Sequence, residues 1–267
     1  MKLRPIAAIV LRQLYLLRGS PVRVFPMVTW VAIDVVLWGF ITRYLNSVSG
    51  SGVNFVPTLL GGVLLWDFCT RIMQGVSTAF LEDVWSRNFL NLFASPLSIF
   101  EYLAGLILTS VLTSVLGVVV MLALATGVFH LGFFSLGAAL AAFFLVLFLF
   151  GIALGVFGSG VVLRFGPASE WLLWPLPALL SPFAAVFYPL ATLPPWMQWV
   201  AHGLPPAYVF EGMRTLLAGG PFPGTLLVEG TAVAVVQLLL ACTFYAGVYR
   251  HAVRTGLLAR YSAESAA

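Results

Sequence analysis

The sequence contains very little charge for its length of 267 residues. Charged residues make up 8% of the chain, whereas an ordinary soluble domain has about 25%. Hydrophobic residues make up 61%, above the roughly 45–50% that is usual in soluble domains. A chain of this size folded in water would need far more charge to cover its surface. The deficit excludes a soluble globular protein and predicts an all-α, polytopic integral membrane protein.

The shortage of lysine, cysteine and histidine excludes further functions. Lys2 is the single lysine, and a phosphate-binding loop needs a lysine after a glycine, so the chain does not hydrolyse nucleotides by itself. Cys69 and Cys242 lie in apolar runs, which is typical of packing residues and not of a disulfide framework. The three histidines lie far apart and lack metal-ligand spacing. We therefore expect no catalytic residue, no metal and no cofactor in this chain.

Long uncharged runs predict six membrane-spanning helices in one transmembrane domain, residues 1–267. A helix crosses the hydrocarbon core with about 20 residues. Residues 102–163 contain no charged residue, and one helix of that length would measure about 93 Å, so the run must fold back on itself. The predicted spans are residues 24–43, 54–80, 98–127, 133–163, 169–190 and 225–249.

The distribution of basic residues predicts the orientation of the chain. With six spans both ends lie on one side, which then holds ten basic residues against two on the other side. Because basic residues favour the cytoplasmic side, we expect cytoplasmic termini and a plasma-membrane location of the bacterial inner-membrane type. Residues 1–22 predict an amphipathic helix in the membrane interface, either as a basic anchor or as a surface that also contacts a cytoplasmic partner.

Residues 81–96, between the second and third spans, predict a short cytoplasmic helix. Trp85 and Phe89 fall on its apolar face. Asp83 and Arg87 stand four residues apart on its polar face, where opposite charges attract. A helix held between two spans can act as a lever that a partner pushes; an ordinary interfacial turn is the alternative.

Residues 191–224 form the longest predicted external segment, and the segment is apolar with two Pro-Pro pairs. Proline pairs suit helix starts and breaks. We therefore expect short re-entrant helices that close the outer end of a pathway, with Trp196, Tyr208, Glu211 and Arg214 as anchors. Glu211 and Arg214 stand three residues apart, so they can pair on one helical face.

Three charged residues, Asp34, Asp67 and Arg71, fall inside predicted spans. Charges inside the membrane are costly and mark either a structural pair or a pathway. Asp67 and Arg71 are four residues apart and can form an ion pair on one helix. A structural pair and a contact with a transported molecule both remain open at this point.

Two segments of the sequence resemble permeases of the type 2 ABC exporters. Residues 82–105 contain an acidic and basic helix followed by Ser-Pro-Leu-Ser and Glu101, as in that family. Residues 188–218 follow its pattern of Tyr-Pro, Leu-Pro-Pro-Trp, Pro-Pro/Thr-Tyr/His and Glu-x-x-Arg, with Pro-Pro-Ala-Tyr as the third motif in this chain. Residues 18–21 are similar to the start of the family's first span. One departure is Asn-Phe at residues 88–89, where many members carry Gly-Thr.

The resemblance implies a permease that pairs with a second copy, as a homodimer, and sits on two ATP-binding cassette subunits. ATP and Mg would be bound by those partner subunits. The cytoplasmic helix would be the coupling helix, and its contact residues would be Glu82, Asp83, Trp85, Arg87 and Phe89. The cargo would be a hydrophobic or amphipathic molecule, a drug-like metabolite or a lipid, moved outward through the membrane. A lipid-linked polysaccharide is the alternative cargo, and no nucleic acid is expected as a partner.

Other classes of function fit the residues less well. An intramembrane aspartyl enzyme would use Asp34 and Asp67, but Arg71 would keep Asp67 ionised, whereas an aspartyl dyad shares a proton. A passive channel usually shows polar or charged rings along its pore, and the third and fourth spans carry no charge. An assembly scaffold is the remaining alternative. An ATP-binding cassette protein encoded beside this chain would decide the class.

Overall fold

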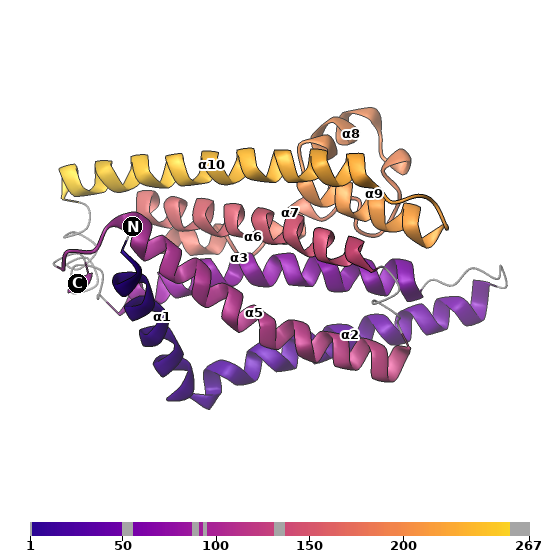
Figure 1. Ribbon diagram of the computed structural model, residues 1–267, viewed down its shortest axis with the longest axis horizontal. Coiled ribbons are helices and arrows are strands. Elements are labelled where there is room, and N and C mark those ends of the chain that lie inside the picture. The colour runs from indigo at the N-terminus through magenta and orange to yellow at the C-terminus, as the bar shows by residue number, and fades with distance from the viewer. Residues whose placement is uncertain (1, 50–55, 87–90, 93–94, 131–136, 257–267) are drawn as a thin grey trace.

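The computed structural model describes residues 2–49, 56–86, 91–92, 95–130 and 137–256. All secondary structure within these residues is helical, which confirms the predicted all-α class. Several long helices run roughly along the long axis of the molecule (Figure 1). They are α2 (Pro21–Ser49), α3 (Gly61–Trp85), α5 (Ile99–Phe129), α6 (Ala138–Phe165) and α10 (Gly224–Thr255).

Four segments among the described residues are long and apolar enough to cross a membrane: Val28–Val48 within α2, and the whole of α5, α6 and α10. Helix α3 has 25 residues, or about 37 Å, which also exceeds the ~30 Å hydrocarbon core. It is less apolar because it contains Asp67, Arg71, Glu82 and Asp83. The structure therefore supports a multi-pass membrane protein, and the count of six spans stays a prediction.

The fifth predicted span, residues 169–190, is not a continuous helix. The chain there forms a 3-10 turn (Pro167–Leu172), the short helix α7 (Leu176–Leu180) and further turns before a second 3-10 turn (Leu190–Thr192). Proline lacks the backbone N–H and its ring clashes with the preceding helical turn, so repeated prolines prevent a long helix. The interrupting residues are Pro167, Pro175, Pro177, Pro182 and Pro189.

Helix α1 (Leu3–Arg18) begins at the end of the molecule where α10 finishes (Figure 1). It confirms the helix predicted for the N-terminal segment, and its place in the membrane interface stays a prediction. Ile9 is buried against α5, where a Cβ on Gly105 would lie 2.6 Å from the Ile9 side chain. Leu3 and Leu14 are exposed.

The segment predicted as a separate cytoplasmic helix begins as part of α3. The second span and the start of residues 81–96 form one unbroken helix that ends at Trp85. Arg87 and Phe89 lie outside the described residues. Helix α3 continues past residue 80 because no proline interrupts it before Pro96, and the point where the second span leaves the membrane stays a prediction.

Two short helices lie at the opposite end of the molecule from the start of α1 (Figure 1): α8 (Pro195–His202) and α9 (Pro205–Leu217). Each begins at a proline of a Pro-Pro pair, as expected from the fixed backbone angle of proline at a helix start. Helix α9 packs against α10 and α6. Short helices in residues 191–224 are thus confirmed, and their depth in the membrane stays a prediction.

The long helices pack in a row in which α6 contacts α10 and α3, and α3 also contacts α5. The contact between α6 and α3 is very close because glycines face it. A Cβ on Gly151 would lie 2.8 Å from the carbonyl oxygen of Cys69, and one on Gly155 would lie 2.8 Å from the Cβ of Val76. Small residues four apart are a usual means of bringing helices together in membranes.

We expect Gly155→Leu to destabilise the protein, because the new side chain would force α6 away from α3. Overpacking of this kind costs about 1–3 kcal/mol or more. The measurement is the thermal unfolding temperature of the purified protein in detergent. Gly247→Leu on α10 is the matched control, since a Cβ there meets nothing within 4 Å. Equal stability of the two variants would contradict the close α6–α3 contact.

Candidate functional site

A polar cavity of about 590 Å³ lies between α1, α2, α3 and α5, and we call it the polar groove. Its polar lining is unusual in a chain with so few charges. Its lining also includes Trp30 on α2 and Trp174, which precedes α7. The polar side chains that line it are Gln13, Asp34, Asp67, Thr70, Arg71, Gln74, Thr78, Glu82, Thr109, Thr113 and Ser114.

The groove follows one face of α3. Its polar residues on that helix, from Asp67 through Gln74 and Thr78 to Glu82, recur every three or four positions, which places them on one side. Fifteen residues of α-helix rise by about 22 Å, so the polar face follows most of the helix length. The groove therefore brings a continuous polar face of α3 to one cavity within a largely apolar bundle.

Asp67 and Arg71 form the predicted ion pair within the groove. Arg71 Nε donates to Asp67 Oδ2 at 2.6 Å, and its Nη2 donates to Oδ1 at 3.1 Å, so the pair is bidentate. The stem of Arg71 passes Gly117 on α5, where a Cβ would lie 3.4 Å from Arg71 Cδ. The pairing is therefore confirmed, and the pair faces a cavity instead of being sealed in the core.

Asp34 joins this pair from a different helix. It lines the same groove, and the charges of Asp67 and Arg71 are close enough to act on it. Asp34 lies 13 residues after the start of α2, about 20 Å along that helix. The structure thus brings together the three intramembrane charges that the sequence marked, although nothing in their spacing placed Asp34 beside the other two.

We expect Asp67→Asn and Arg71→Gln each to lower the folded yield more than the double change does. Removing one partner leaves the other charge uncompensated, which usually costs about 3–5 kcal/mol for a buried pair. The yield of monodisperse protein after size-exclusion chromatography measures this. If both single variants fold as well as the wild type, the ion pair has no structural role. A role of the pair in the transport cycle would then be the remaining interpretation.

A second charged cluster lies where α1 meets the end of α3. Arg12 forms an ion pair with Asp83, whose side chain is only 1% exposed. The hydroxyl of Tyr102 on α5 donates to the other oxygen of Asp83 at 2.7 Å. Asp83 therefore joins three helices, and we call this set of three residues the latch.

The start of α5 is tied to the N-terminus as well. The backbone N–H of Lys2 donates to Glu101 Oε1 at 2.6 Å. Glu101 also accepts from the backbone of Ser98, whose hydroxyl accepts from the backbone of Glu101, so the two form a capping box. Helix α1 thus contacts both helix ends that flank residues 86–98, the region of the predicted coupling segment.

The latch changes the roles expected for the coupling residues. Asp83 was expected to meet a partner, but it is buried and bonded within this chain. Glu82 lines the polar groove instead. Trp85 is 51% exposed and is the described coupling residue with the most available surface. The sequence could not reveal the Asp83 contacts, because Arg12 lies 71 positions away.

We expect Tyr102→Phe to destabilise the protein by about 1–3 kcal/mol, because a buried carboxylate loses a hydrogen-bond donor. The measurement is again thermal unfolding in detergent. Tyr44→Phe is the matched control, since Tyr44 is exposed on α2. If both variants unfold at the same temperature, the Tyr102 bond to Asp83 does not contribute to stability.

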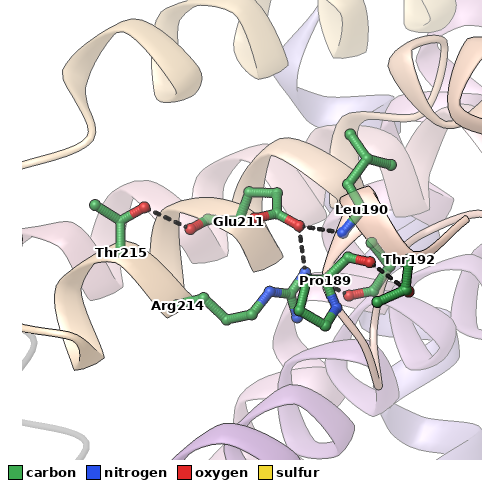
Figure 2. A network of polar contacts seen from close by, with 7 residues as sticks. Pro189, Leu190, Thr192, Glu211, Arg214 and Thr215 are labelled. Carbon is green, nitrogen blue, oxygen red and sulfur yellow. Dashed lines mark hydrogen bonds and ion pairs between the residues drawn. The ribbon is translucent and has the colours of Figure 1, made fainter.

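The opposite end of the molecule holds the network shown in Figure 2. Arg214 Nη2 donates to Glu211 Oε1 at 3.0 Å, which confirms the predicted pair on α9. The same oxygen of Glu211 accepts the backbone N–H of Leu190 at 2.6 Å. Arg214 also donates to the carbonyl of Ala185 at 2.8 Å. Ala185 has a φ of 55°, a left-handed conformation that is unusual without glycine, so Arg214 helps to hold a strained turn.

The other predicted outer residues lie close to this network. Trp196 on α8 is 62% exposed and contacts Phe183 edge-on at 6.1 Å between ring centroids. The Tyr208 hydroxyl donates to the carbonyl of His202 at 2.9 Å and so joins α9 to α8. Burial, followed by the nearby charge of Glu229, raises the pKa of Tyr208, which therefore stays protonated as a donor.

Sequence reasoning missed the uncharged part of the polar groove. Thr109, Thr113 and Ser114 on α5 line it, and so do Gln74 and Thr78 on α3. Hydroxyl residues in membrane helices often donate to a carbonyl of their own helix, as Thr113 does to the carbonyl of Thr109 at 3.1 Å. They are therefore not recognised from the sequence as part of a polar site. The spacing of polar residues along α3, every three or four positions from 67 to 82, was a signal that could have revealed the groove.

The profile of a family described as ABC-2 family transporter protein matches residues 33–249. This range includes all of the long helices except the first part of α2 and the last part of α10. No curated protein matches the sequence significantly.

Proposed function

Because the chain belongs to the ABC-2 family of transporter proteins, we propose that it is the membrane-spanning subunit of an ATP-driven exporter. ATP binding and hydrolysis take place on separate ATP-binding cassette subunits, which also hold Mg. Two copies of this chain pair as a homodimer in the bacterial inner membrane, with cytoplasmic termini. The cargo is a hydrophobic or amphipathic molecule that moves outward from the cytoplasm or the inner leaflet.

The polar groove is the observation that carries this proposal. A helix that crosses lipid without function has no need of a polar face about 22 Å long. The groove also has apolar and aromatic lining, including Leu17, Trp30 and Trp174. A surface that is polar along one side and apolar along the other matches an amphipathic molecule. This supports a drug-like metabolite or a lipid as cargo, in preference to the lipid-linked polysaccharide.

The latch supports a route for coupling. A partner that pushes the region of residues 86–98 would move the end of α3 and the start of α5 together, because Asp83 accepts from both Arg12 and Tyr102. Helix α1 would follow the same movement through Lys2 and Arg12. The exposed Trp85 is the described residue best placed to contact the ATPase.

ATP hydrolysis by the reconstituted complex tests the proposal. We expect only background hydrolysis from the purified chain alone, and stimulation of the chain bound to its ATP-binding cassette subunit by members of a panel of lipids, drugs and glycolipids. Thr113→Leu fills the groove and should reduce stimulation by about tenfold, equivalent to ~1.4 kcal/mol. Thr243→Leu on the exposed face of α10 is the matched control and should have no effect. Robust hydrolysis by the pure chain, or no stimulation by any compound, would overturn the proposal.

A further inference from the structure

We propose that the end of the polar groove around Asp34, Asp67 and Arg71, which we call its deep end, binds a cationic amphiphile, and that Asp34 is the counter-ion. A cationic amphiphile is a molecule with an ammonium group on an apolar tail. The inference rests on the proposed function and narrows it, since it names the chemical class of the cargo.

The deep end of the groove carries more negative than positive charge. Asp67 is engaged by Arg71 through two hydrogen bonds. Asp34 makes no hydrogen bond or ion pair with any residue that the structure describes, and it faces the same groove. The two carboxylates of Asp34 and Asp67 are therefore balanced by one guanidinium, that of Arg71. A carboxylate without a counter-ion inside a membrane span is costly, and an ammonium group brought by the cargo would offset that cost.

Two tryptophans line the groove that Asp34 faces. Trp30 lies one helical turn before Asp34 on α2, and Trp174 lines the groove from the segment after α6. Aromatic faces attract ammonium groups through the ring quadrupole, and tryptophan does so most strongly. Leu17 and Ala79 add apolar lining that suits a hydrocarbon tail. An anionic cargo would gain nothing from these rings and would be repelled by Asp34.

Gln13 gives an independent sign that the groove holds a ligand. Its side chain lines the groove and is 4% exposed, and its amide nitrogen has no hydrogen-bond partner among the described residues. Buried polar groups are almost always bonded, so an unbonded donor in a cavity wall points to a missing acceptor. Gln13 follows Arg12, which bonds Asp83 about 18 Å along α3 from Arg71, so an oxygen on the part of the cargo away from its ammonium group would supply that acceptor.

Equilibrium binding of three probes to the complex of this chain with its ATP-binding cassette subunit tests the inference directly. The complex is placed in nanodiscs of an uncharged galactolipid, and three probes with the same acyl chain are compared: an acylcholine, a neutral glycol ester and an acyl taurine. We expect the acylcholine to bind at least about tenfold more tightly than the neutral ester. Asp34→Asn should reduce this preference to about twofold or less. Glu229→Gln, an exposed acid outside the groove, is the matched control and should keep the full preference.

Equal binding of the acylcholine and the neutral ester by the wild type would overturn the inference, and so would an unchanged preference in Asp34→Asn. If Asp34→Asn fails to fold, Trp30→Leu replaces it and must lower the preference. ATP hydrolysis distinguishes the two proposals. Equal stimulation by all three probes would support the proposed exporter function and would contradict a cationic cargo. Adding an aminophospholipid to the nanodiscs identifies the source, since competition indicates a lipid headgroup and its absence indicates a soluble amphiphile.

Discussion

A charged side chain inside the apolar bundle needs a bonding partner of opposite charge nearby, and helix α3 carries several such side chains. Asp67 and Asp83 are both on this helix, and each is bonded to an arginine. An uncompensated charge at either position would cost several kcal/mol. The partner of Asp67 lies on α3 itself, whereas the partners of Asp83 come from α1 and α5 and hold those helices beside α3. Along residues 69–76 the opposite side of α3 carries no charge and packs against Gly151 and Gly155 of α6. Helix α3 thus packs tightly against α6 on one side and lines the polar groove with α1, α2 and α5 on the other.

The contacts that the sequence predicted well are local. Asp67–Arg71 and Glu211–Arg214 stand four and three residues apart, so helix geometry alone brings the members of each pair together. The bond between Arg12 and Asp83 joins positions 71 apart, and only the packing of α1 against α3 and α5 creates it. The broken backbone of residues 169–190 was missed for a different reason. The run is apolar enough to suggest a span, whereas five prolines in residues 167–189 prevent one continuous helix.

The packing also determines which contact can change during transport. Helix α6 approaches α3 so closely that a Cβ on Gly155 would lie 2.8 Å from Val76, and such contacts do not deform gradually. Helix α2 packs mainly on α5 and has little contact with α3. Gly39 of α2 lies against the ring of Phe129 on α5, which joins those two helices closely. Helix α5 is also held to α3, because the Ser110 hydroxyl donates to the carbonyl of Ile72 at 3.0 Å. A movement that widens the groove therefore changes the small contact between α2 and α3.

The two ends of the groove region are held by bonds of different kinds. At the α1 end, the latch joins three helices through side chains, so a push on α3 or α5 reaches α1 directly. At the other end, Glu211 and Arg214 bond to backbone atoms of Leu190 and Ala185, which fixes a strained turn to α9 (Figure 2). Side-chain bonds between separate helices can break and re-form in one step, whereas a turn held by its backbone moves as a unit with the helix it is bonded to. The latch end can therefore rearrange by exchanging side-chain bonds, whereas α9 and its turn move as one rigid body.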